Sequence, residues 1–399
     1  MRQVLLVFVA VQALLLLLLS PSAEGLAAKS SKKSKKLASA GGKGFGASSS
    51  GAALLHTPDD SESTQKLLQF LKSQKAKGVD QGVAEIGIHD KTGQRGLFAT
   101  TNIKKDQIIC MIPSDVALAL SDPAKLGKDA PTFAHGGANF LNMYWNNAER
   151  RPLWSFYLDT LPSDAKSPYF DATPDFFSQE EIELLEFPRL LDNIRKRQHD
   201  IESLAAEQGL DQDQLQFATW LVSSRAFNIN LADDNTQNTP EEEQYDERGQ
   251  VVTKAGAGLN SIRVMVPFLD LCNHDSVAPN CRFTMIDADK DEAWFALEAN
   301  RPIPAGRELQ MAYRSGIYSS VELFLNYGFV PEENKVDAYM LRKGGEGVIA
   351  SADGWTTTLE EDQSMLEMLQ SKSDDDNNND VLKKILAFRS NMKKAYQDL

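Results

Sequence analysis

Short apolar segments separated by turn-forming residues mark the first folded part of the chain. From Val83 to Thr100 these segments, punctuated by Gly87, Gly93 and Gly96, predict a strand, a turn and a second strand. The segment from Ile103 to Ile112 has the spacing of a further strand. The folded part of the chain is therefore expected to begin with β structure.

The spacing of apolar residues becomes helical from about residue 122 to residue 228. Within this region, Phe133 to Trp145, Glu180 to Ile201 and residues 213–227 each predict a helix. The next stretch, residues 232–258, is polar and rich in acidic and turn-forming residues. Such a composition predicts a flexible loop.

Strands are predicted again after this loop. They are Arg263–Leu271, Arg282–Ile286, Ala293–Leu297 and Glu308–Tyr313. A short helix is predicted over Ser320–Tyr327, with Ser320 as its N-cap and Gly328 as its C-terminal stop. Strands on both sides of a helical insertion predict an α+β fold whose β core is interrupted by that insertion.

Residues 338–399 are expected to form a short helical C-terminal region. Leu359–Leu369 predicts one helix, and apolar residues at helical spacing between Leu382 and Tyr396 predict an amphipathic one. An acidic and asparagine-rich spacer separates the two.

The N-terminal segment has the features of a targeting signal. Arg2 precedes an apolar run from Val4 to Leu19, and small residues follow, which is the order of a secretory signal peptide over residues 1–25. The run is short for a membrane span, so we expect no stable span after cleavage; an uncleaved anchor is the alternative. Residues 26–57 hold six lysines and no acidic residue, which indicates an unfolded linker or a transit-like segment. Two destinations fit: a plastid reached through the secretory route, or the endomembrane system itself.

Charge and cysteine content narrow the function classes. The net charge is −14, and the basic N-terminal segment makes the remainder more acidic still. An acidic surface repels phosphate, which argues against nucleic-acid binding and suits a basic protein partner. The three cysteines, Cys110, Cys272 and Cys281, do not form the framework of a disulfide-rich protein.

Three ordered segments carry the candidate chemistry. They are GQRGLFATTNIKKDQIICMIP (93–113), WLVSSRAFNI (220–229) and a stretch over 266–337 that contains VPFLDLCNHD, GRELQMAY and NYGF. Together they resemble the SET domains of the Rubisco large-subunit methyltransferase family, which includes an actin-histidine methyltransferase branch. The resemblance covers about residues 79–337. It implies an S-adenosylmethionine-dependent methyltransferase that acts on a lysine of a non-histone protein.

The resemblance also assigns roles to residues. Tyr313 is implied to be the catalytic tyrosine, whose hydroxyl would steady the reacting groups in a narrow channel. Gly93 to Arg95 are implied to contact the cofactor through their backbone, Arg225 to bind its methionine carboxylate or hold the site, and Asn273 to meet its amino-acid end. The full set implied for cofactor binding is Gly93, Gln94, Arg95, Arg225, Asp270, Leu271, Cys272, Asn273, His274, Tyr327, Gly328 and Phe329.

Two other activities remain alternatives. In the histidine-methylating branch an amide stands two positions after the arginine of the insertion, whereas here that position is Phe227, which favours lysine. A non-catalytic SET-fold module that binds a peptide is the second alternative. The presence of Tyr313 together with Asn273-His274 argues against it.

A zinc site is the remaining possibility for the segment 272–281. Cys272, His274 and Cys281 are ligand types that zinc accepts, but zinc needs a fourth ligand or a water, and no CxxC pair occurs. The sequence therefore predicts no bound metal.

Overall fold

The computed structural model describes residues 56–79, 82–120, 132–167, 169–230, 244–245, 251–252, 261–288, 292–313, 318–332, 334–343, 354–371 and 377–399. The predicted signal segment and nearly all of the basic segment 26–57 lie outside these residues. Within the described ranges, no helix combines the length and the apolar character that a membrane span requires.

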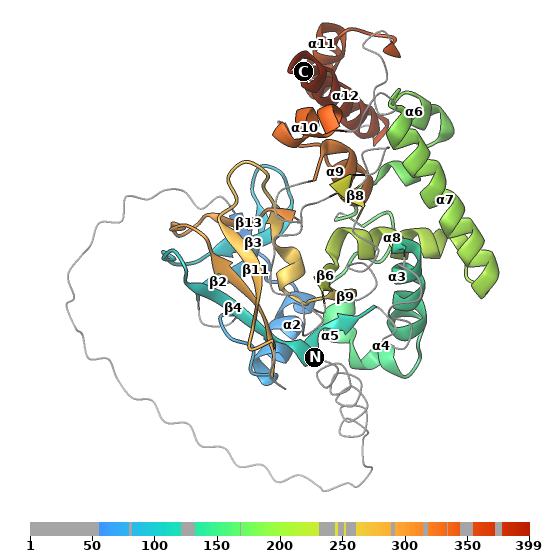
Figure 1. The fold of residues 1–399 in the computed structure, drawn as a ribbon. Coiled ribbons are helices and arrows are strands. Elements are labelled where there is room, and N and C mark those ends of the chain that lie inside the picture. The colour runs from blue at the N-terminus through green and yellow to red at the C-terminus, as the bar shows by residue number, and fades with distance from the viewer. Residues whose placement is uncertain are drawn as a thin grey trace, which may run out of the picture.

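The core is a mixed eight-stranded sheet. Its strands are His56–Pro58 (β1), Ala84–His89 (β2), Arg95–Ala99 (β3), Ile108–Pro113 (β4), Asn273–His274 (β10), Cys281–Ile286 (β11), Trp294–Ala299 (β12) and Glu308–Met311 (β13). The strand order is β1-β2-β3-β13-β11-β12-β4, and β10 pairs with β13 beside this path. Because β13 pairs with both β3 and β11, the strands that precede the insertion and those that follow it form one sheet (Figure 1).

A second, three-stranded sheet joins the core to the insertion. It consists of Leu118–Ala119 (β5), Phe227–Asn230 (β6) and Ser261–Met265 (β9), in the order β5-β9-β6. Gln244–Tyr245 (β7) and Val251–Val252 (β8) pair with each other. The rest of the predicted loop 232–258 lies outside the described residues.

The prediction of one strand over Arg263–Leu271 was wrong. Strand β9 ends at Met265, and the chain then turns into a 3-10 helix at Leu269–Leu271 (η5). Pro267 has no N–H to continue a ladder, and Phe268 adopts a positive φ of 75°. After this sharp turn the chain reaches β10, which pairs in parallel with β13.

Helices make up most of the segment between β5 and β6. The α-helices before β6 are Glu62–Ser73 (α2), Phe133–Phe140 (α3), Arg150–Leu153 (α4), Ser155–Leu158 (α5), Gln179–Glu183 (α6), Pro188–Gln208 (α7) and Gln212–Arg225 (α8). Short 3-10 helices lie at Ser114–Val116 (η1) and Pro174–Phe176 (η4), and Leu141–Trp145 (η3) is a π-helix. In Figure 1, α3, α7 and α8 lie on the opposite side of the molecule from β2 and β4. The helical insertion predicted between the strands is therefore present.

Two predicted helix boundaries within the insertion were wrong. The predicted helix Glu180–Ile201 is divided into α6 and α7, because Glu186 adopts a left-handed φ of 50° and Pro188 begins the next helix. The predicted helix 213–227 ends at Arg225, since Phe227 already pairs with β9.

The C-terminal region is helical, as predicted. Its helices are Lys335–Lys343 (α10), Leu359–Gln370 (α11) and Asn377–Gln397 (α12), and they lie at one end of the molecule next to Ser320–Tyr327 (α9) (Figure 1). Helix α9 has the predicted bounds, but its N-cap is Ser319 and not Ser320. Ser319 forms a capping box with Glu322, whereas the Ser320 side chain donates to Asp337.

Candidate functional site

The site forms where the chain passes from β13 to α9. Tyr313 follows the end of β13, and its ring lies 4.9 Å from that of His274 and 4.6 Å from that of Tyr327. Phe329 closes the group, with its ring centroid 5.7 Å from His274. We call these four side chains the aromatic cluster. Three separate sequence segments, 273–274, 313 and 327–329, thus meet at one place.

Tyr313 is held at both ends. Its hydroxyl donates to the carbonyl oxygen of Cys272 at 3.1 Å, and its backbone N–H donates to Nδ1 of His274 at 2.9 Å. Burial is the main reason that the pKa of the Tyr313 phenol lies well above its usual value. The phenol therefore stays neutral near neutral pH, with its hydroxyl oriented by the Cys272 carbonyl.

His274 is neutral as well. Because Nδ1 accepts a hydrogen bond, the hydrogen-bond network assigns the ring proton to Nε2. Burial lowers the pKa of this imidazole to about 4. Nε2 is buried and has no hydrogen-bond partner among the described residues. This leaves one buried donor in the cluster ready for a ligand atom.

Asn273 ties three strands together. Its side-chain nitrogen donates to Oε1 of Glu308 at 2.7 Å and to the carbonyl oxygen of Arg95 at 3.1 Å. A Cβ on Gly96 would lie only 2.8 Å from that nitrogen and 2.7 Å from Oε1 of Glu308, so a larger residue here would displace the Asn273–Glu308 pair. Burial raises the pKa of Glu308. Sequence reasoning named Gly96 only as a turn marker and Glu308 only as the start of a strand, and gave neither a role in the site.

The side chain of Arg95 is fully engaged away from the cluster. Its guanidinium binds Asp59 at 2.8 Å, Thr64 at 2.6 Å and the carbonyl of Thr160 at 2.9 Å. Only the backbone of Arg95 is left for a cofactor, in keeping with the backbone role implied for residues 93–95. Gly93 adopts a positive φ of 68° in the turn before β3, and Gln94 connects it to Arg95.

Arg225 and Asp270 form a buried ion pair, and Asp270 lies two residues before Cys272 in the chain. Nη1 of Arg225 lies 3.3 Å from Oδ2 of Asp270, and the hydroxyl of Tyr157 donates to the same oxygen at 2.8 Å. The side chain of Arg225 is only 15 % exposed, so this is not a surface ion pair. Burial raises the pKa of Asp270 by more than the neighbouring Arg225 guanidinium lowers it. Sequence reasoning missed Tyr157, which lies 113 positions from Asp270 and carries no local signal.

Leu271 and Cys272 have buried side chains, with exposures of 6 % and 0 %. Only their backbone atoms are placed to meet a ligand, and the carbonyl of Cys272 already accepts from Tyr313. In the described part of the chain, no three histidine, cysteine or acidic side chains are grouped so that they could hold a metal ion.

Gly328 joins α9 to the insertion. It caps the helix with a φ of 83°, and a Cβ there would lie 2.6 Å from the carbonyl oxygen of Asp171. Glycine is needed for both reasons. The close contact fixes Tyr327 and Phe329, on either side of it, within the aromatic cluster.

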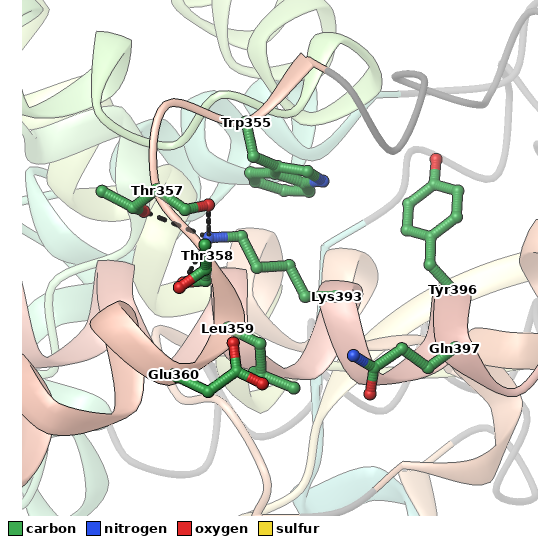
Figure 2. Close-up of a pocket in the computed structure, with 8 residues that line it drawn as sticks. All are labelled: Trp355, Thr357, Thr358, Leu359, Glu360, Lys393, Tyr396 and Gln397. Atoms are coloured by element: carbon green, nitrogen blue, oxygen red, sulfur yellow. Dashed lines mark hydrogen bonds between the residues drawn. The ribbon is translucent and has the colours of Figure 1, made fainter.

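A pocket of about 290 Å³ lies elsewhere, among the C-terminal helices (Figure 2). It is lined by Trp355, Thr357, Thr358, Leu359, Glu360, Lys393, Tyr396 and Gln397. The predicted catalytic and cofactor residues do not line this pocket.

Comparison with protein families identifies the class. The SET domain model matches residues 94–314, more than half of the chain, and the chain belongs to the SET-domain family. This confirms the predicted fold class and the family resemblance. A search of curated proteins finds no match by sequence.

Solved structures agree with this assignment. The SET domain of LSMT bound to lysine and AdoHcy is 15 % identical, with a TM-score of 0.55 over 86 % of this chain and 90 % of that one. Rubisco LSMT bound to AdoMet is 16 % identical, with a TM-score of 0.55 over 85 % of this chain and 90 % of that one. At these identities the likeness concerns the fold.

Proposed function

We propose that this SET-domain methyltransferase is a protein-lysine N-methyltransferase that acts on a non-histone protein. Its cofactor is S-adenosylmethionine, which supplies a sulfonium-bound methyl group that an amine can displace in line. The observation that carries the proposal is the placement of Tyr313 in the aromatic cluster, with its hydroxyl held by the Cys272 carbonyl.

The residues present suit this cofactor. His274 Nε2, Asp270 Oδ1 and Arg225 Nε are buried polar atoms without partners among the described residues. A ligand with an amine, a carboxylate and a heteroaromatic ring offers groups that match such donors and acceptors. The family resemblance, which implies cofactor contacts on the same segments, supports this proposal.

The chain's own residues would do the rest of the work. Tyr313 and the Cys272 carbonyl form a fixed pair of oxygens beside the reacting amine, and the rings of Tyr327 and Phe329 exclude water. A neutral lysine amine needs only orientation and a route for its proton, since neither a metal nor a covalent intermediate is required. The chain therefore contributes positioning more than proton transfer.

The choice of lysine over histidine rests on Phe227. Its ring stacks on Phe283, with centroids 4.5 Å apart and planes 19° apart. This position offers an apolar ring where the histidine branch has an amide that could hold an imidazole.

The test is to incubate the full-length protein with labelled S-adenosylmethionine and a cell extract, then to hydrolyse the labelled product. We expect labelled methyl-lysine, and no label with Tyr313→Phe protein at the same time point. Methyl-histidine would establish the alternative substrate. Cofactor binding without any labelling would instead support a non-catalytic module.

A further inference from the structure

Two of the three cysteines meet at the edge of β13. The sulfur atoms of Cys272 and Cys281 lie 3.5 Å apart. Both side chains are buried, at 0 % and 1 % exposure, and both are free thiols. A disulfide has an S–S length of about 2 Å, so a modest approach of the sulfurs would suffice to form one.

The surrounding strands hold the two thiols in place. Cys272 directly precedes β10 and Cys281 begins β11, and both strands pair in parallel with β13. The Cys272 thiol donates to the carbonyl of Leu309, and the Cys281 thiol donates to that of Gln310, each at 3.3 Å. A buried cysteine is commonly an inert core residue. Two sulfurs in contact, fixed by neighbouring carbonyls of the same strand, are a more specific arrangement.

We propose that Cys272 and Cys281 form a disulfide that slows methyl transfer; the effect on turnover rests on the function proposed above. The oxidant is glutathione disulfide. One cysteine thiolate attacks it and releases one glutathione, and the second thiolate then displaces the other glutathione from the mixed disulfide. The two thiols lose two protons and two electrons, and two molecules of glutathione form.

The exchange takes place while the chain folds. In the finished sheet both thiols are inaccessible, and burial raises the pKa of Cys272 well above its usual value, so that little thiolate is present. Before β10 and β11 pair with β13, both thiols are solvated and reactive. The redox state during folding therefore fixes the state of the native protein.

The bond would act on the site through the backbone of Cys272. Its carbonyl accepts the hydrogen bond from the Tyr313 hydroxyl, and the next two residues are Asn273 and His274. Drawing the sulfurs together shifts this carbonyl within a closely packed interior. A displacement of about 1 Å in a catalytic arrangement costs up to about 100-fold in rate. We expect the oxidised protein to turn over at least about tenfold more slowly.

The experiment refolds the full-length protein from denaturant with either reduced or oxidised glutathione. Free thiols are then alkylated, and the digest is analysed by mass spectrometry. Cys281→Ser blocks the bond and keeps a donor for the Gln310 carbonyl. Cys110→Ser is the matched control, because Cys110 is equally buried but has no part in the proposed bond. Circular dichroism verifies that each sample has refolded.

We expect a cross-linked Cys272–Cys281 peptide in oxidised wild-type and Cys110→Ser protein, with slower turnover in both. Cys281→Ser should turn over equally fast after either treatment. Complete alkylation of all cysteines after oxidative refolding, or a cross-link to Cys110, would overturn the proposal. Equal turnover of the cross-linked and reduced forms would overturn its regulatory part. Loss of activity in reduced wild-type protein would count against the proposed function, while the peptide map would still decide whether the disulfide forms.

Discussion

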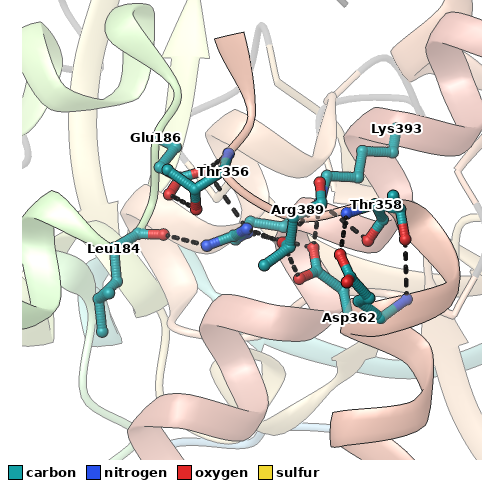
Figure 3. A network of polar contacts seen from close by, with 9 residues as sticks. Leu184, Glu186, Thr356, Thr358, Asp362, Arg389 and Lys393 are labelled. Atoms are coloured by element: carbon teal, nitrogen blue, oxygen red, sulfur yellow. Dashed lines mark hydrogen bonds and ion pairs between the residues drawn. The ribbon is translucent and has the colours of Figure 1, made fainter. Parts of the chain in front are cut away.

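Two buried ion clusters, one in the SET core and one among the C-terminal helices, differ in how completely their atoms are paired. In the C-terminal cluster, Asp362 accepts from Nε of Arg389 at 3.1 Å and from Nζ of Lys393 at 2.5 Å (Figure 3). Arg389 also binds the carbonyl of Leu184 and the carboxylate of Glu186. All three nitrogens of its guanidinium therefore have partners.

The cluster in the SET core is incomplete. Arg225 and Tyr157 share one oxygen of Asp270, while Oδ1 of Asp270 and Nε of Arg225 lack partners within the described residues. Each buried polar atom left unpaired costs about 1–3 kcal/mol. A complete cluster is explained by its structural role alone. The incomplete one fits the cofactor site proposed above, although buried ion pairs elsewhere, such as Arg189–Glu322, also have unpaired atoms.

The largest expected effect comes from breaking the complete cluster. Asp362→Ala leaves Arg389 and Lys393 buried without their shared carboxylate, which should lower the free energy of unfolding by about 3–5 kcal/mol. Urea unfolding measures this change. Glu360→Ala, at an exposed position in the same first turn of α11, should change it by less than about 0.5 kcal/mol. Equal midpoints for both variants would show that the cluster is not structural.

The second prediction concerns His274, whose Nε2 has no hydrogen-bond partner among the described residues. The pKa of His274 is about 4 in the folded protein and about 6.5 in the unfolded chain, so the folded form binds fewer protons between these values. The stability that this group contributes is complete above about pH 6.5 and is lost as the pH falls towards 4, by up to about 3 kcal/mol. His274→Gln, which cannot titrate, should lack this loss. Urea unfolding of both proteins from about pH 7 to pH 4 tests this, and parallel curves would contradict it.

The third prediction separates catalysis from binding. Tyr313→Phe removes the hydroxyl but keeps the ring, so kcat should fall at least about 100-fold while the Kd for S-adenosylmethionine stays within a few-fold of wild type. The hydroxyl contacts the Cys272 carbonyl and is not needed to fill the aromatic cluster. Tyr327→Phe provides a comparison within the same cluster. A parallel loss of cofactor affinity would mean that Tyr313 has a structural role instead.

Much of the fold was predictable because local patterns determine it. The bounds of α9 follow from its apolar spacing and Gly328, and the strands β2 and β3 follow from apolar segments separated by the turn at Gly93. The division between α6 and α7 was missed because the apolar spacing continues across Glu186. The premature end of β9 was missed for a similar reason, although Pro267 was a usable signal.

The site was less predictable, because its contacts join distant parts of the chain. Motifs selected Tyr313, His274 and Asn273 correctly as neighbours. They gave no indication that Tyr157 would reach Asp270 or that the Cys272 and Cys281 sulfurs would touch. Such contacts depend on how the insertion and β13 pack together. The spacing of apolar and polar residues along the chain does not reveal that packing.

The smallest expected effect bears most directly on the comparison of the two clusters. Arg225→Gln and Arg389→Gln remove the same group from an incomplete and a complete cluster. On the cofactor site proposed above, we expect Arg225→Gln to weaken S-adenosylmethionine binding about tenfold, or about 1.4 kcal/mol, because it removes a donor proposed to contact the cofactor. Asp270 keeps Tyr157 as a partner, and burial already raises its pKa towards the neutral form, which moderates the cost to folding. Arg389→Gln should lower stability and leave the cofactor Kd unchanged. Calorimetric titration of both folded variants with S-adenosylmethionine, without added metal, measures the two Kd values. Equal Kd values would show that unpaired atoms in a buried ion cluster do not mark a cofactor site.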